Sequence, residues 1–336
     1  MRSILTFLLL LLFLAAGAGA ALFYLNSATD SVKGQSFIFR VEKGESLSMI
    51  AGRLQRNDLL RSAFLLKLLS RFKKTESAFK SGTFQIPAAA TTAVIHDLLV
   101  AGNQNQVRIT IPEGWTIKKI AGRLAEKKIT TAEDFESASG EKALIEAFGI
   151  PADSLEGYLF PDTYYFPESF PASVIVEQMV ENFFRQLEEI LPDYDDWPEK
   201  KLHEGIIMAS IIEREYRIVE EAPLIASVFY NRLKYNIGLE SCATLEYIIT
   251  EIEEKPHPEY LTLEHKQIDS AYNTYKWAGL PPGPISNPGV VALKASFEPA
   301  KTDYWYFVLK DPEKGRHFFS SKLEEHNTAK YFYLKQ

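Results

Sequence analysis

The chain repeats one strand–turn–helix pattern at two places, and this duplication restricts its fold more than any other feature of the sequence. Residues 36–54 and 107–124 match at an offset of 70 positions, and both contain Ile-Ala-Gly-Arg-Leu. Gly44 and Gly114 stand at the predicted turns. Ser46 and Thr116 stand where a hydroxyl group can cap the following helix by accepting from its free N–H groups. Two copies are too few for a solenoid, so we expect two strand–helix units of one layout.

The N-terminus carries an uncharged run of 22 residues, from Ile4 to Leu25. At the rise of an α-helix this run is long enough to cross the hydrocarbon core of a bilayer. Because Arg2 precedes the run, the rest of the chain is expected outside the cytoplasm. A cleaved signal peptide is the alternative, since Ala18-Gly19-Ala20 resembles a cleavage site, although the apolar run continues beyond it. We predict a cytoplasmic stub at 1–3, a transmembrane helix at 4–25 and a polar linker at 26–35.

Composition argues against several functional classes. The net charge of -7 argues against a nucleic-acid-binding protein, which normally presents a basic face. The chain has 1 cysteine, Cys242, which excludes an intramolecular disulfide and a cysteine-cluster metal site. Its 6 histidines show no metal-ligand spacing. We therefore expect no metal, no other cofactor and no nucleic-acid partner.

The periodicity of the sequence predicts an α+β fold, with helices and short strands in separate stretches. Residues 36–105 are expected to form an α/β subdomain, and residues 106–336 a mainly helical domain with short strands. Apolar spacing and capping signals predict helices at 59–72, 92–101, 132–138, 141–148, 173–191, 200–218, 221–233 and 323–333. Further strands are predicted at 82–87, 304–308 and 316–319, and residues 256–299 are expected to be mostly loop.

One predicted helix contains a candidate acid, Glu213. The residues seven, four and three positions before it lie on the same helical face: Ile206, Ala209 and Ser210. The two small side chains are expected to leave room beside the carboxyl group, and apolar surroundings would resist its ionisation, as a general acid near neutral pH requires. The alternative is a surface glutamate paired with Arg217 one turn later. Arg214 and Glu215 are expected to point away from this face into solvent.

Other segments combine aromatic rings with Asn, Thr and carboxylates, as a carbohydrate-binding cleft does, although core packing is the alternative for the rings. In chain order the motifs are Glu156–Tyr164 (EGYLFPDTY), Ala209–Glu213 (ASIIE), Ala226–Leu233 (ASVFYNRL), Tyr272–Tyr275 (YNTY) and Gly279–Ile285 (GLPPGPI). Together they closely resemble the YceG-like family, over nearly the whole chain. Residues 106–336 resemble its catalytic domain. The first copy of the duplicated pattern resembles the opening of a LysM module, a small peptidoglycan-binding unit, so residues 36–105 are expected to be LysM-like. The alternative is a packing unit without glycan contact.

The resemblance implies an endolytic peptidoglycan lytic transglycosylase, with Glu213 as the catalytic residue. Such an enzyme cleaves the β-1,4 bond between N-acetylmuramic acid (MurNAc) and N-acetylglucosamine (GlcNAc) inside a glycan strand, leaves 1,6-anhydro-MurNAc ends and terminates nascent strands. The expected substrate-binding residues are Ser210, Glu240, Thr244, Tyr272, Asn273, Thr274 and Tyr275. This chain has Cys242-Ala243 where many members have Asp-Pro, so the turn chemistry of that loop differs from the family pattern.

The resemblance also implies a place of action. The chain is expected to cross the bacterial inner membrane once through residues 4–25, with its body on the periplasmic, extracytoplasmic side beside membrane-bound peptidoglycan synthases. One acid suffices for the lytic reaction, because the C6 hydroxyl of the muramic acid is a tethered nucleophile. Glu240, as a second carboxylate, would favour hydrolysis instead. A hydrolytic muramidase and a non-catalytic, membrane-anchored peptidoglycan-binding protein are the alternatives. A pyridoxal-phosphate lyase would need a Schiff-base lysine and a phosphate cradle, which the sequence does not display.

Overall fold

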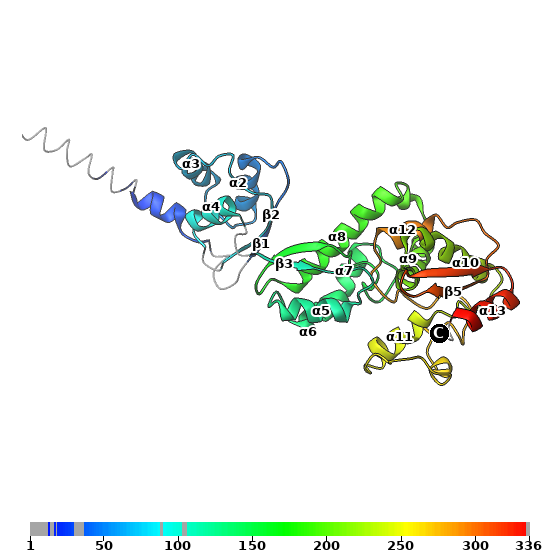
Figure 1. Cartoon of the computed structure of the whole chain (residues 1–336). Coiled ribbons are helices and arrows are strands. Elements are labelled where there is room, and N and C mark those ends of the chain that lie inside the picture. Colours follow the sequence, from blue (N-terminus) through cyan, green and yellow to red (C-terminus); the bar gives the residue numbers. More distant parts are fainter. Residues whose placement is uncertain are drawn as a thin grey trace, which may run out of the picture. The chain divides into compact units, whose positions relative to one another are not determined.

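The computed structural model describes residues 13, 17, 19–29, 37–87, 90–102 and 106–333. The chain divides into two compact units, Met1–Gln106 (unit 1) and Val107–Gln336 (unit 2). Both units combine helices with two-stranded sheets, which confirms the predicted α+β class (Figure 1).

Helical backbone runs from Gly19 to Asn26, but most of the predicted transmembrane helix at 4–25 lies outside the described residues. Within the described ranges, no helix has both the length and the apolar character needed to cross a membrane. The end of this helical segment is held against the rest of unit 1. The side-chain oxygen of Asn26 accepts from the N–H of Ala93 at 3.0 Å, and the hydroxyl of Thr92 donates to the carbonyl of Leu25 at 3.3 Å. The first residues of the predicted linker are therefore part of the folded unit.

Unit 1 has the element order strand, helix, helix, strand, helix. Its elements are β1 (Phe37–Val41), α2 (Leu47–Arg56), α3 (Ala63–Phe72), β2 (Gly82–Ile86) and α4 (Thr92–Ala101). The two strands pair antiparallel with Phe39 opposite Phe84, and both rings are buried in the core that the helices cover. Ser46 caps α2 by accepting from the N–H of Met49, as the sequence predicted. α3 starts four residues later than predicted, where Ser62 caps it.

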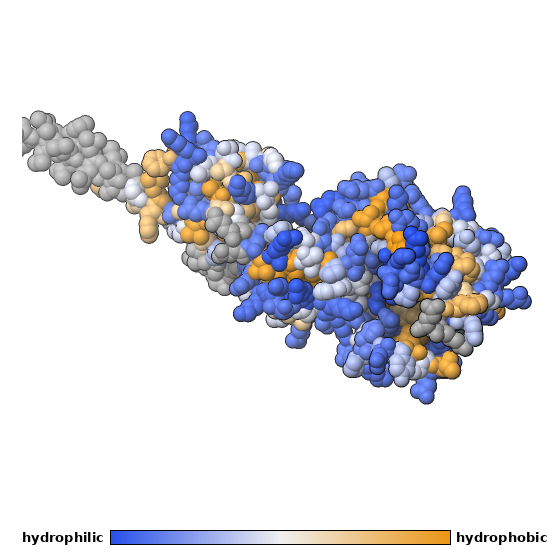
Figure 2. Space-filling view, in the orientation of Figure 1, coloured by the Kyte–Doolittle hydropathy of each residue, from blue (hydrophilic) through white to orange (hydrophobic). Residues whose placement is uncertain are grey.

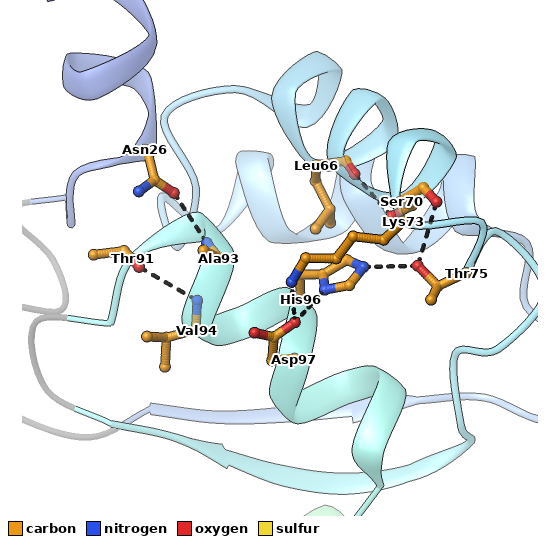
Figure 3. A network of polar contacts seen from close by, with 10 residues as sticks. All are labelled: Asn26, Leu66, Ser70, Lys73, Thr75, Thr91, Ala93, Val94, His96 and Asp97. Carbon is orange, nitrogen blue, oxygen red and sulfur yellow. Dashed lines mark hydrogen bonds and ion pairs between the residues drawn. The ribbon is translucent and has the colours of Figure 1, made fainter.

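A polar network around the buried His96 ties α4 to the end of α3 (Figure 3). The ring of His96 in α4 makes hydrogen bonds with Thr75 Oγ1 at 2.8 Å and with Asp97 Oδ1 at 2.7 Å. Lys73 Nζ donates to Asp97 Oδ1 at 2.6 Å. The hydrogen bonds from Lys73 and then His96 hold the pKa of Asp97 below its usual range. Because a buried imidazole needs such partners, this network is a structural support of unit 1.

Unit 2 starts with the second copy of the duplicated pattern and ends in a hairpin and a helix. Its first elements are β3 (Gln106–Thr110), α5 (Ile117–Glu126), α6 (Ala132–Ser139), α7 (Lys142–Ala147), β4 (Thr163–Pro167) and α8 (Ala172–Ile190). They are followed by α9 (Glu199–Glu215), α10 (Ala222–Lys234), α11 (Cys242–Tyr247), a π-helical turn (Ile248–Ile252), α12 (Val290–Phe297), β5 (Tyr306–Asp311), β6 (Arg316–Ser320) and α13 (Leu323–Tyr333). β3 pairs with β4, and β5 pairs antiparallel with β6. Thr116 caps α5, as predicted from the repeat.

α9 is the central helix of unit 2, in contact with α10, α11 and α12. Every residue from Ile206 to Ile212 is buried, and a helix that is covered on all sides is typical of a protein core. A Cβ atom on Gly205 would lie 2.4 Å from the ring of Phe297 in α12, so the close approach of the two helices requires glycine there. α9 is therefore a rigid support for the residues at its C-terminal end.

Candidate active site

Glu213 lies in the last turn of α9, where the helix leaves the core, and its side chain is only partly covered. Its Oε2 accepts a hydrogen bond from the backbone N–H of Gly289 at 2.9 Å. The hydroxyl of Tyr216, the residue that ends the helix, donates to the same carboxyl group. Arg217, the alternative partner from the sequence, lies against Gly315. Glu213 is thus held by a backbone donor and a phenol.

The surroundings of Glu213 favour its protonated form. Burial raises the pKa of Glu213 to about 8, and the nearby carboxylate of Glu113 acts in the same direction. The hydrogen bonds from Gly289 and Tyr216, and the charge of Arg214, act in the opposite direction. A carboxyl group with this pKa is mostly protonated near neutral pH, while its ionised form has donors ready to stabilise it. Such a group can give up a proton and later take one back.

Glu113 brings a second carboxyl group to Glu213, and it was not among the site residues predicted from the sequence. A Cβ atom on Gly114 would lie 3.5 Å from Glu213 Cγ, so the turn between β3 and α5 passes directly over the acid. A Cβ atom on Gly289 would lie 1.9 Å from Glu113 Oε1, and only glycine permits that approach. The signal in the sequence was the repeat itself, because the first copy has Lys43 where the second has Glu113.

Asn287 joins the segments that surround Glu213. Its side-chain oxygen accepts from the N–H groups of Gly157 and Leu159, both at 2.9 Å. Its side-chain nitrogen donates to the carbonyl of Trp115 at 2.9 Å and to Glu156 Oε1 at 2.8 Å. All four hydrogen-bonding positions of the amide are therefore used. Burial raises the pKa of Glu156 to about 8, so this carboxyl group is also mostly neutral at pH 7. The EGYLFPDTY motif thus supports the loop that carries Gly289.

The space predicted beside Glu213 is occupied by the protein itself. Ser210 is buried, and its hydroxyl accepts from the N–H of Ile285 at 3.0 Å and donates to the carbonyl of Ile207 at 2.7 Å. The hydroxyl of Ser286 donates to the carbonyl of Ser210 at 3.0 Å. The expectation of open room over Ala209 and Ser210 was wrong, because these small side chains accommodate the segment that contains Ile285 and Ser286.

The expectation that Arg214 and Glu215 point into solvent was also wrong. Arg214 Nη2 donates to Glu246 Oε2 at 2.8 Å. The hydroxyl of Ser241 and the N–H of Ala243 donate to Glu215, whose pKa is raised by burial. The helical wheel of α9 could not reveal this, because the partners come from α11 and the residue before it, which lie against the end of α9. Ala243, which stands where many family members have proline, supplies an N–H that proline lacks.

The predicted substrate-binding residues fall into two groups. Four are buried and hydrogen-bonded within the protein: Ser210, Thr244, Asn273 and Thr274. Three reach the surface: Glu240, Tyr272 and Tyr275. Glu240 lies 3.5 Å from Arg232, and the hydroxyl of Tyr275 lies 3.2 Å from the thiol of Cys242. Contact with substrate stays a prediction for all seven. In the part of the chain that the structure describes, no group of His, Cys, Asp and Glu side chains could hold a metal ion.

Comparison with known proteins gives concordant results. The model of the YceG-like family matches residues 39–331. A Bacillus subtilis (strain 168) protein named endolytic murein transglycosylase is 30% identical, and the match covers 94% of this chain and 91% of that protein. A protein of the same name from Streptococcus pneumoniae serotype 2 is 26% identical, over 96% of this chain and 64% of that protein. A crystal structure of a yceG-like protein from Listeria monocytogenes is 30% identical, with a TM-score of 0.58 over 88% of this chain and 99% of that chain.

Proposed function

Because the chain belongs to the YceG-like family, we propose that it is an endolytic murein transglycosylase, like the relatives that bear this name. Its substrate is the glycan strand of peptidoglycan. It cleaves the bond from MurNAc to GlcNAc inside the strand and leaves 1,6-anhydro-MurNAc ends, so that it terminates nascent strands.

In this proposal Glu213 serves first as acid and then as base. The protonated carboxyl group gives its proton to the glycosidic oxygen of the departing GlcNAc while the bond from that oxygen to C1 of MurNAc breaks. The resulting carboxylate takes the proton of the C6 hydroxyl of the same MurNAc, whose oxygen forms the new bond to C1. The tethered hydroxyl has a high effective concentration, so one carboxyl group can serve both steps. The observation that supports this role is the raised pKa of Glu213 beside the donors Gly289 and Tyr216.

Glu113 favours a second candidate, a hydrolytic muramidase. Glycoside hydrolases use a second carboxylate to activate water or to attack the sugar. In the lytic reaction the same carboxylate would have an electrostatic role: its negative charge opposes ionisation of Glu213 and stabilises positive charge that develops on the sugar ring. The two reactions differ in their products, because hydrolysis leaves reducing ends.

The test uses the full chain in detergent micelles with purified peptidoglycan, and mass spectrometry of the ends produced. We expect anhydro ends from the unsubstituted chain and at least a ~100-fold loss of cleavage in Glu213→Gln. Glu204→Gln, in an exposed residue of the same helix, is the matched control and should cleave normally. If only reducing ends were found, the activity would be that of a muramidase and not that of a transglycosylase. If the unsubstituted chain cleaved nothing, the non-catalytic peptidoglycan-binding protein would be the remaining interpretation. Normal cleavage by Glu213→Gln would exclude Glu213 as the acid.

The location follows from the substrate, because murein lies outside the cytoplasmic membrane. We propose that the run at 4–25 anchors the chain in the inner membrane as a single pass, with the body on the extracytoplasmic side beside membrane-bound peptidoglycan synthases. Extraction of membranes with alkaline carbonate tests the anchor, since an integral protein stays in the membrane pellet and a peripheral one is released. We also propose that residues 36–105 are a LysM-like unit that binds glycan.

A further inference from the structure

α3 has a hydrophobic stripe on its outer side. Phe64, Leu68 and Phe72 are spaced four residues apart, so they lie along one side of the helix, and they are 67%, 44% and 87% exposed. Leu66 and Ser70, on the opposite side, are buried in unit 1. Three large apolar side chains in a row on an exposed helix face indicate a surface that contacts a membrane, a protein or another ligand.

Positive charge borders this stripe. Lys67 and Arg71 are exposed on the same side of α3. From Arg61 to Lys80 the chain has 6 basic residues and 1 acidic residue, Glu76. Unit 1 has 12 basic and 6 acidic residues, which give it a net charge of +6. Unit 2 has 25 basic and 38 acidic residues and a net charge of -13, so the net charge of -7 of the whole chain conceals a basic unit 1. A hydrophobic helix face flanked by Lys and Arg is the chemistry of a helix that lies in an anionic lipid surface.

Arg61 connects this face to the N-terminal helical segment. Its guanidinium group donates to the carbonyl of Ala28 at 3.0 Å and to the hydroxyl of Ser27 at 3.1 Å, and it lies 4.7 Å from the ring centre of Tyr24. The described part of that segment carries hydrophobic side chains at the surface (Figure 2). α3 begins two residues after Arg61, so a membrane from which this segment emerges lies within reach of a helix about 15 Å long.

We propose that α3 lies on the membrane surface, with Phe64, Leu68 and Phe72 among the acyl chains and Lys67 and Arg71 on the headgroups of anionic phospholipids. This docking goes beyond the proposed activity and would fix how unit 1 stands on the bilayer. It relies on the proposed anchor only for proximity, because the face itself requires no more than an anionic lipid surface.

The test places a single environment-sensitive fluorophore on α3 of the full chain. Cys242, the one native cysteine, is exposed and is first replaced by serine, and Leu68→Cys then gives one labelling position. In vesicles of phosphatidylglycerol and phosphatidylcholine, we expect blue-shifted emission and quenching by nitroxide-labelled lipids. In phosphatidylcholine alone the docked fraction should fall on the order of fivefold for each basic residue at the surface. Lys67→Glu with Arg71→Glu should abolish the emission shift. The neutral pair Lys67→Gln with Arg71→Gln should give an intermediate shift, and it serves as the test if the charge-reversed pair does not fold.

Emission typical of water, without quenching, in the anionic vesicles would overturn the proposal. A shift that appears without lipid and grows with protein concentration would assign the face to a second copy, and a shift caused by glycan fragments alone would assign it to substrate; either would overturn lipid docking. Carbonate extraction reports on the anchor separately. If carbonate releases the chain but the lipid-dependent emission shift is still seen, the docking of α3 is supported and the proposed membrane anchor is excluded. A retained chain with a water-exposed probe overturns the docking alone, and cleavage of peptidoglycan is measured independently of both.

Discussion

Replacement of Glu113 by Gln removes a negative charge beside Glu213 at nearly constant shape, and it should lower the pKa of Glu213. The structure limits the separation of the two groups. The nitrogen of Gly289 lies 2.9 Å from Glu213 Oε2, and a Cβ atom on Gly289 would lie 1.9 Å from Glu113 Oε1. Because N and Cβ of one residue are about 2.5 Å apart, the two carboxyl oxygens are at most about 7 Å apart.

The size of the effect follows from Coulomb's law. At about 7 Å two unit charges repel by about 2.4 kcal/mol at an effective dielectric constant of about 20, and by about 0.6 kcal/mol at the value for water. Since one pKa unit corresponds to about 1.4 kcal/mol, the pKa of Glu213 should fall by about 0.4 to 1.7 units in Glu113→Gln. Glu113 is exposed, so solvent screening favours the lower part of this range.

The assay is the pH dependence of anhydro-end release by the full chain. A general acid must be protonated, so activity falls as the pH rises through its pKa, and this alkaline limb should move to lower pH in Glu113→Gln by the amount given above. Glu126→Gln, in an exposed glutamate of α5 that bonds to Arg123, is the matched control and should leave the limb in place. An alkaline limb that stays in place or moves upward in Glu113→Gln would refute the electrostatic role of Glu113.

Three further predictions concern the framework of the site. Asn287→Ala removes four side-chain hydrogen bonds and should lower the free energy of unfolding in urea by about 4 kcal/mol or more, whereas Asn231→Ala removes two and should cost about half; equal losses would show that the Asn287 bonds are not special. Gly157→Ala should cost at least about 3 kcal/mol, because φ is 90° and the new Cβ would lie 2.5 Å from Pro284; unchanged stability would mean that the loop relaxes freely. Glu156 should make stability fall as the pH rises from about 4.5 to about 8, by at most about 1.4 kcal/mol per pH unit, since its folded pKa is raised and the proton is retained in the folded state only. Urea titrations across this range should show a flatter dependence for Glu156→Gln, and a dependence identical to that of the unsubstituted chain would contradict the raised pKa.

Helix ends that depend on local chemistry could be predicted from the sequence. α4 begins and ends at the predicted residues, because Thr91 caps its start and Gly102, with positive φ, ends it. α13 also has its predicted bounds. α9 was predicted to continue to Ile218, but it ends at Glu215, where Tyr216 takes extended backbone and places its hydroxyl on Glu213. That end depends on a tertiary contact, which helix propensity does not contain.

The surroundings of the candidate acid could not be predicted in the same way. Glu113 is 100 residues before Glu213 and Gly289 is 76 residues after it, so no local periodicity relates the three. The small residues beside Glu213 were expected to leave open room, but the segment with Ile285 and Ser286 fills that space, and a helical wheel cannot show which distant segment packs there. The family resemblance pointed to Glu213, and its catalytic role stays a prediction. The repeat marks Glu113 as a difference between its two copies, but only the folded structure shows that its carboxyl group lies near Glu213.

The order of the segments around Glu213 has a consequence for the timing of activity. The ribosome releases Glu113 first, then Glu213, and the loop with Ile285 and Gly289 last. A nascent or truncated chain that stops before this loop contains the acid but lacks the residues that cover α9 and donate to the carboxylate. Its glutamate would be hydrated, with an ordinary pKa, and would be ionised at neutral pH. The raised pKa of Glu213 would thus arise only after this loop has been synthesised and has folded onto α9.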